Sequence, residues 1–157
     1  MHQLDRSDCK ILAHLKDNGQ LTTNELASKI FLSASQCSRR RARLEKDNYI
    51  SGYHADLNLG KLGYALTALI SITSNYHNQE NNERFIELIN EETAILEAFE
   101  LTGPMDYILK VMVPDLEGLT ELINDTLLPH ESVQHINSAI ALKTIKSNND
   151  LLNNYKN

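Results

Sequence analysis

Apolar residues in the first fifty positions recur at the spacing of an α-helix. Asp5 is a candidate N-cap for a first helix, whose apolar positions are Leu4, Ile11, Leu12 and Leu15. Thr22 and Glu25 form the pattern of a capping box before a second helix, and Ser33 and Gln36 repeat it before a third. Only two residues separate the second helix from Ser33. This short turn is typical of a helix-turn-helix unit.

From residue 49 onward the pattern changes. Residues 49–64 mix β-prone residues with glycines and predict a strand within a linker. Four further strands are predicted at residues 65–73, 94–102, 105–113 and 133–145. Two amphipathic helices lie between them, one carrying Phe85, Ile86, Leu88 and Ile89, the other carrying Leu116, Leu119, Leu122, Ile123 and Leu127. The order βαββαβ indicates a ferredoxin-like sandwich with both helices on one face of an antiparallel sheet.

The expected fold class is therefore α+β, with a winged-helix-like helix-turn-helix domain before the βαββαβ domain. The predicted parts are residues 1–50 for the helix-turn-helix, 51–63 for the linker, 64–147 for the second domain and 148–157 for a polar tail. The strand at 65–73 is apolar on both faces, so the helices leave one apolar face bare. We expect a second subunit to cover it, which predicts a homo-oligomer.

Charge is distributed unevenly between the two halves of the chain. The formal net charge is −6, yet residues 1–60 have a balance of +2 and residues 61–157 a balance of −8. Four arginines occur within positions 39–43, on the third helix. On a helical wheel one side of this helix carries Gln36, Arg39, Arg40 and Arg43, while Arg41 lies on the flank of the buried side. The sequence therefore predicts an outward arginine stripe.

An arginine stripe on the second helix of a helix-turn-helix suits double-stranded DNA. The helix N-terminus approaches base edges in the major groove, and arginines on later turns contact phosphates or guanine. The predicted DNA-binding residues are Ser33, Ser35, Gln36, Arg39, Arg40 and Arg43. Two alternatives to DNA binding are a charged face that contacts only solvent and a helix-turn-helix that docks another protein. Affinity that falls steeply with salt would favour DNA.

The remaining composition gives no indication of catalysis. The histidines are scattered, the two cysteines belong to no ligand spacing, and phosphate-binding or nucleophile motifs are absent from the sequence. We expect no enzyme activity, no cofactor and no metal. The N-terminus has no signal-peptide pattern and the longest apolar run is too short to span a bilayer, so a cytoplasmic protein without membrane contact is expected.

Five segments occur in a fixed order along the chain: "LDRSDCKILAHLKDNGQLTTNELASKI", "LSASQCSRRRARLEKDNYISGYHADLN", "LGY", "LTGPMDYILKVMVPD" and "DTLLPHESVQ". In this order and spacing they resemble the Lrp/AsnC, or feast/famine, transcriptional regulators. The likeness covers residues 4 to 146. It implies DNA-binding regulators of amino-acid-related metabolism whose βαββαβ domains form dimers that assemble into octamers or similar particles. It also implies a small amino-acid effector, of the leucine or methionine class, bound between subunits.

The segment "LTGPMDY" is the candidate effector loop. Gly103 and Pro104 favour a turn, and Asp106 either caps that turn or supplies a counter-charge for an amino-acid ammonium group. The residues that match the family's effector-responsive positions are Leu101, Thr102, Gly103, Pro104, Met105, Asp106, Ala139, Ile140 and Ala141. An enzyme alternative on the same two-domain fold, a sirohaem decarboxylase, would need a cluster of His, Tyr and Arg around a large propionate-bearing ligand. The second domain has the single arginine Arg84.

Overall fold

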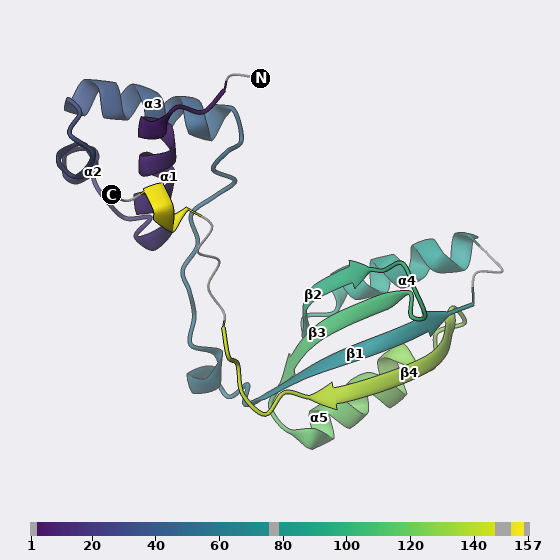
Figure 1. The fold of residues 1–157 in the computed structure, drawn as a ribbon. Helices are drawn as coiled ribbons and strands as arrows, with labels where there is room; N and C mark the ends of the chain where they lie inside the picture. The colour runs from purple at the N-terminus through teal and green to yellow at the C-terminus, as the bar shows by residue number, and fades with distance from the viewer. Residues whose placement is uncertain (1–2, 76–78, 147–151, 156–157) are drawn as a thin grey trace. The chain divides into compact units, whose positions relative to one another are not determined.

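The computed structural model describes residues 3–75, 79–146 and 152–155 (Figure 1). The chain divides into two compact units, one formed by Met1–Asp56 with Lys146–Asn157 and the other by Leu57–Ile145. We call them the helical unit and the sheet unit.

The helical unit contains the three predicted helices, α1 (Arg6–Asp17), α2 (Thr23–Ile30) and α3 (Ala34–Lys46). Each begins at its predicted N-cap, and all three capping boxes are formed, including one at α1 in which Asp8 is the reciprocal partner. The helices pack around a small apolar core made of Ile11, Leu15, Leu26, Ala27, Ile30, Cys37 and Leu44. The helix-turn-helix prediction is confirmed.

The sheet unit has the predicted βαββαβ order. Its strands are β1 (Leu66–Ser74), β2 (Ile95–Glu100), β3 (Tyr107–Val113) and β4 (Val133–Ile140), and its helices are α4 (Gln79–Glu91) and α5 (Leu116–Glu121), the latter continued by a π-helical segment, Leu122–Leu127. The strands form one antiparallel sheet in the order β2-β3-β1-β4. This is the ferredoxin-like arrangement that the pattern indicated.

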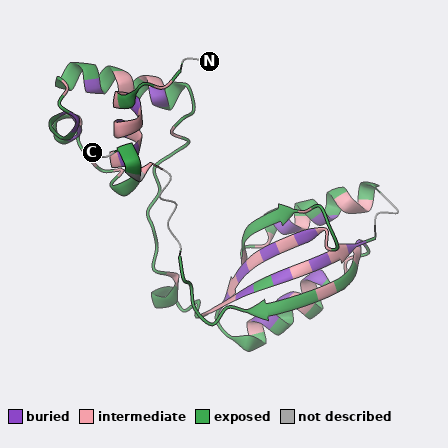
Figure 2. Ribbon diagram, viewed as in Figure 1, coloured by how far each residue is buried: buried purple, intermediate pink, exposed green. Residues whose placement is uncertain are grey.

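Alternate residues of the central strands face opposite sides of the sheet. Ala68, Ile70 and Ile72 of β1 are buried, and they pack with β3 residues and with α4 and α5 in one core. The intervening residues point away from the helices, and Figure 2 shows this alternation as bands of buried and partly exposed positions along β1 and β3. The outer face of the sheet is therefore open in the single chain.

Two predicted strands differ in the structure. The strand expected in residues 51–63 is not formed, because no described backbone pairs with this segment, and a 3₁₀ turn occupies Leu59–Leu62 instead. The last strand ends at Ile140 rather than at residue 145, since pairing with β1 stops near Thr67. The predicted polar tail, 148–157, lies largely outside the described residues, which include the turn Asn153–Tyr155.

Candidate functional site

The N-terminal end of α3 presents polar side chains to solvent. Ser33, Ser35 and Gln36 are all exposed. The Gln36 amide donates to Ser33 Oγ at 3.3 Å, and the Ser33 amide donates to Gln36 Oε1 at 3.2 Å. Arg39 follows one turn later and is also exposed, with no ion pair recorded for it among the described residues. This end of the helix is thus capped, polar and open.

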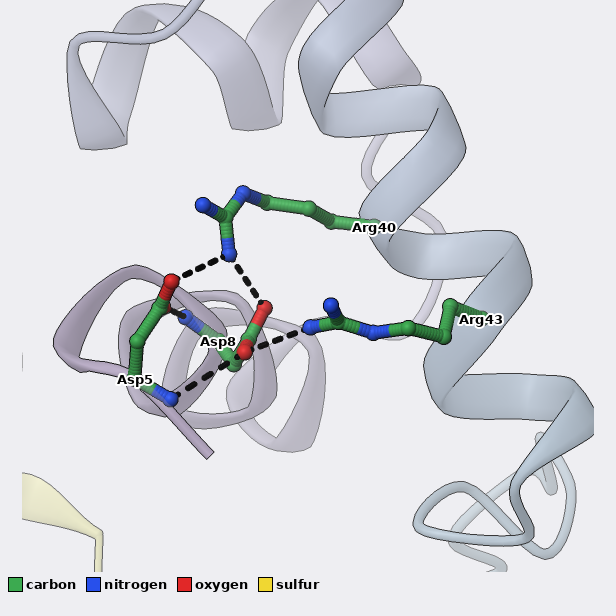
Figure 3. A network of polar contacts seen from close by, with 4 residues as sticks. All are labelled: Asp5, Asp8, Arg40 and Arg43. Carbon is green, nitrogen blue, oxygen red and sulfur yellow. Dashed lines mark hydrogen bonds and ion pairs between the residues drawn. The ribbon is translucent and has the colours of Figure 1, made fainter. Parts of the chain in front are cut away.

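Arg40 and Arg43 do not belong to an outward stripe, and that part of the helical-wheel prediction is wrong. Arg40 Nη1 donates to Asp5 Oδ2 at 2.6 Å and to Asp8 Oδ1 at 2.8 Å, and Arg43 Nη2 donates to Asp8 Oδ2 at 2.5 Å (Figure 3). Their side chains are only 25% and 32% exposed, and Asp8 is 1% exposed. Both arginines turn toward α1, because its first turn lies beside that flank of α3.

The energetics favour keeping these ion pairs. Removing one partner from a buried ion pair costs about 3–5 kcal/mol, whereas a hydrogen bond to a charged group contributes about 1.5–3 kcal/mol. An arginine that left Asp8 for a phosphate would exchange one charge-assisted hydrogen bond for another and would leave the buried carboxylate with one partner fewer. The hydrogen bond from the Asp8 amide, with the Arg40 guanidinium, holds the pKa of Asp5 below its usual value, and the bond to Asp8 raises that of Arg40.

The Arg41 side chain is also paired within the helical unit. Its guanidinium donates to the Leu21 carbonyl at 3.0 Å and to Glu45 Oε1 at 3.0 Å, and it lies 4.9 Å from the centre of the Tyr53 ring. Hydrogen bonds from Tyr53 and then Arg41 lower the pKa of Glu45. Of the four clustered arginines, only Arg39 points freely to solvent in the described part of the chain.

The candidate effector loop connects β2 to β3 at one edge of the sheet unit. Gly103 has φ +137°, a conformation that favours glycine, and the loop is closed by the Leu101 amide donating to the Asp106 carbonyl at 2.7 Å. Asp106 Oδ2 accepts from the Ser74 amide at 2.6 Å and from Ser74 Oγ at 3.2 Å. The carboxylate thus ties the loop to the end of β1.

The second group of predicted effector residues lies beside β1 between its centre and its N-terminal end. Ala139 pairs with Leu69, and the Ala141 amide donates to the Thr67 carbonyl, whereas the Asp106 amide donates to the Ile72 carbonyl. A strand rises about 3.3 Å per residue, so Ile72 lies roughly 10 Å along β1 from Leu69 and roughly 17 Å from Thr67. One chain does not bring them together.

Sequence reasoning missed a surface pocket of about 280 Å³ beside the loop. It is lined by loop residues and by polar residues on the outer face of β1 and β4: Pro104, Met105, Ser71, Thr73, His135 and Asn137. The alternation of side chains along each strand places Ser71 with Thr73, and His135 with Asn137, on one face of its own strand. That the two pairs lie side by side next to the loop follows from the pairing of β4 with β1. Sequence reasoning also missed Asp8, although Asp5-x-x-Asp8 has capping-box spacing.

Two kinds of feature are absent from the part of the chain that the structure describes. No three His, Cys, Asp or Glu side chains are grouped so that they could hold a metal ion. No helix there combines the length and apolar character needed to cross a membrane.

The comparisons with known proteins agree with this architecture. Residues 67–151 match the model described as the Lrp/AsnC ligand binding domain, and residues 4–51 match a winged helix-turn-helix DNA-binding model. The chain is 37% identical to the Bkd operon transcriptional regulator of Pseudomonas aeruginosa, over 92% of this chain and 95% of that protein. It is 32% identical to the leucine-responsive regulatory protein of Escherichia coli, over 95% and 91%.

A solved structure is similar over nearly the whole chain. A transcriptional regulator from Neisseria meningitidis, in a complex with L-Met, has a TM-score of 0.91 and 34% identity, covering 95% of this chain and 96% of that one. A helix-turn-helix domain followed by a ligand-binding βαββαβ domain defines a class of ligand-responsive DNA-binding regulators. This chain belongs to the Lrp/AsnC family of transcriptional regulators. It is therefore a DNA-binding transcriptional regulator with a ligand-binding domain.

Proposed function

We propose that this regulator contacts duplex DNA through the N-terminal half of α3. Ser33, Ser35 and Gln36 meet base edges and the adjacent backbone, and Arg39 contacts a phosphate or guanine. The observation that carries the assignment is the capped, exposed helix end followed by an arginine left open to solvent. Arg40 and Arg43, which the wheel also assigned to DNA, remain on α1 in this proposal.

In the proposed regulator, the helix-turn-helix domains of two subunits bind DNA together. A second copy covers the outer face of the sheet, and the resulting dimers assemble further into an octamer or similar particle. The apolar outer residues Leu69, Ile108 and Met112 support this, because an open apolar sheet face is typical of an interface. Paired recognition helices then read half-sites about one turn of DNA apart, or a multiple of it.

The salt dependence of DNA binding tests the role of α3. Fluorescence anisotropy with a labelled mixed-sequence duplex measures the affinity between about 50 and 200 mM salt. We expect Arg39→Gln to weaken binding and to reduce the log–log salt slope by about one per recognition helix. Arg84→Gln is the matched control, since Arg84 is the exposed arginine of the sheet unit and pairs with Glu80. Equal slopes for both variants would contradict the assignment.

We further propose that a small amino acid of the leucine or methionine class is the effector, bound between subunits. The loop at residues 101–106 of one subunit would meet the strand end at residues 139–141 of another, because one chain separates them. The pocket beside Pro104 and Met105 supports a ligand at the loop. Such a ligand acts only by binding one assembly better than another.

Light scattering tests the effector proposal. The mass of the purified protein is measured alone and with each of the twenty amino acids, and we expect a mass of several subunits that shifts with leucine, methionine or a similar side chain. Asp106→Ala should weaken that response, because it releases the loop from Ser74. Asp125→Ala on the π-helical segment is the control for charge. Calorimetry that detects none of the twenty amino acids bound would contradict the proposal.

The same proposal places the protein in the cytoplasm as a regulator without catalytic activity. Membership of a family of transcriptional regulators supports both statements. A purified preparation that carries a coloured tetrapyrrole would favour the sirohaem decarboxylase alternative.

A further inference from the structure

The most deeply buried charge of the helical unit lies against the recognition helix. The Asp8 side chain, in the first turn of α1, is 1% exposed, and each of its oxygens accepts a hydrogen bond from a different arginine of α3 (Figure 3). Arg40 holds Oδ1 at 2.8 Å and Arg43 holds Oδ2 at 2.5 Å. The Asp5 amide also donates to Oδ2, at 3.2 Å.

Two arginines on one carboxylate restrict the motion of α3. Arg40 and Arg43 are three residues apart, so they lie on successive turns of one helix face. Any slide of α3 along its axis, or rotation about it, lengthens at least one of the two bonds to Asp8. The apolar core of the helical unit has no such directional requirement, because apolar contacts are non-directional. The carboxylate therefore supplies a directional restraint that apolar packing lacks.

We propose that Asp8 is a positioning residue for DNA recognition, which fixes the register of α3 through Arg40 and Arg43, and that these two arginines do not contact DNA. This inference rests on the proposed DNA-binding role of α3 and deepens it. Asp5, whose carboxylate also holds Arg40 at 2.6 Å, contributes a weaker restraint because its side chain is 51% exposed. Arg39 remains the arginine of α3 that meets DNA.

The opposite interpretation makes Arg40 and Arg43 phosphate contacts that Asp8 neutralises in the free protein. The two interpretations predict opposite signs for Asp8→Asn. If the arginines contact DNA, removing the carboxylate frees them and strengthens binding. If Asp8 positions the helix, removing its charge weakens recognition even though the domain becomes more positive.

The experiment measures binding of the full chain to two probes at fixed salt. One is a duplex that the wild-type chain selects from a random-sequence pool, and the other is a mixed-sequence duplex of the same length. Asp8→Asn keeps the shape of the side chain and an acceptor for the Asp5 amide. Asp47→Asn is the matched control, since it removes the same charge from the exposed cap residue at the other end of α3.

We expect Asp8→Asn to weaken binding to the selected duplex about tenfold and to leave mixed-sequence binding within about twofold, because phosphate contacts act equally on all sequences. Asp47→Asn should weaken neither. Selected-duplex binding by Asp8→Asn that equals or exceeds that of Asp47→Asn would overturn the inference. A uniform loss on both duplexes would do so as well, because a change in the register of α3 is expected to weaken binding to the selected duplex alone.

A second variant covers the case in which Asp8→Asn does not fold. Asp5→Asn keeps a good N-cap residue and breaks only the outer bond to Arg40, so it retains the helix. We expect a loss of about twofold, confined to the selected duplex, and tighter binding would overturn the inference. The failures are distinguishable: a wild-type chain that selects no duplex from the pool and does not bind the mixed-sequence duplex contradicts the DNA-binding role of α3 itself, and with it this inference.

Discussion

The two exposed faces of the molecule are built differently. The open end of α3 carries hydroxyl, amide and guanidinium groups, whereas the outer face of the sheet combines the apolar residues Leu69 and Met112 with the polar residues beside the loop and one described ion pair, Lys110 with Glu97 at 2.6 Å. A face that meets a polyanion needs hydrogen-bond donors that remain hydrated until binding. A face that meets another protein gains stability by removing apolar area from water. The contrast supports the proposed division between DNA recognition by α3 and assembly through the sheet.

The interiors differ in a related way. The sheet unit has a continuous apolar core between one sheet face and two helices. The helical unit has a smaller apolar core and adds the buried ion pairs of Asp8. A small core orients its helices weakly, so directional polar contacts contribute more to the geometry there. Variants of matched residues in the helical unit and the sheet unit therefore test whether the two cores differ in this way.

The largest expected effect comes from truncating a buried leucine in each unit. Leu44 and Leu109 are both fully buried, so Leu→Ala at either position should cost about 3 kcal/mol through lost contacts and a residual cavity. We expect Leu109→Ala to lower protection only in the sheet unit and Leu44→Ala only in the helical unit. Hydrogen exchange of the backbone amides measures this. Equal losses in both units from either variant would show that they unfold together.

The next effect concerns assembly through the outer sheet face. Leu69 is 42% exposed at the centre of β1, and a lysine there would place a charge in the proposed interface. We expect Leu69→Lys to weaken the dimer about 100-fold, or nearly 3 kcal/mol, while the fold of the subunit is retained. Leu116→Lys, at an exposed leucine on the helix side, should leave the mass unchanged. Light scattering distinguishes these outcomes, and an intact Leu69→Lys oligomer would contradict the interface.

A smaller effect of opposite sign is expected at the turn of the helix-turn-helix. Phe31 has φ 59° and ψ 44°, a left-handed conformation that costs a non-glycine residue about 1 kcal/mol or more, and it is 90% exposed. Phe31→Gly should therefore stabilise the helical unit by about 1 kcal/mol, because little packing is lost. Phe31→Ala keeps the Cβ and should give no such gain. Thermal unfolding measures both, and a destabilised Phe31→Gly would indicate a contact made by the ring.

The smallest expected effect is a pH dependence of the sheet unit. Burial lowers the pKa of His130 below 6.5, with Arg84 acting in the same direction and Glu131 opposing it. Its Nδ1 accepts from the Ser132 amide at 3.2 Å, which requires the unprotonated nitrogen. The folded state binds the proton less well than the unfolded state, so this stability is complete above pH 6.5 and decreases as the pH falls toward the folded-state pKa.

His130→Asn provides the test, because its Oδ1 retains an acceptor and cannot titrate. We expect thermal unfolding of the sheet unit between pH 7.5 and 5.5 to depend less on pH in this variant than in the wild type. An unchanged pH dependence would assign the effect to other groups.

Most of the fold that the sequence predicted correctly follows from local patterns of capping and apolar residues. The capping residues Thr22 and Ser33 and the helical spacing of apolar residues predicted α2 and α3 correctly, because caps and amphipathic periods act within one or two turns. The same reasoning failed for the linker strand. A strand requires a partner backbone, and pairing is a property of the assembled sheet rather than of the segment.

The candidate site was also only partly predictable from the sequence. A helical wheel assigned Arg39, Arg40 and Arg43 to one side of α3, but it contains no information about which helix lies beside that side. The buried Asp8 comes from a segment more than thirty residues earlier. Likewise, the glycine and proline of residues 101–106 predicted a turn, and the proposed effector role of that loop came from the family resemblance. Its separation from residues 139–141 followed only from the antiparallel register of β4 on β1.

The sequence by itself determined the helices, the four strands of the sheet and the charged character of α3, since these depend on neighbours a few positions away. It also indicated the family, through several segments in a fixed order along the chain. The tertiary structure decided which arginines are free, because a guanidinium turns toward whichever carboxylate the packing brings within about 3 Å. It also decided that the two halves of the predicted effector site lie at different positions along β1, one beside Ile72 and Ser74 and the other beside residues 67–69.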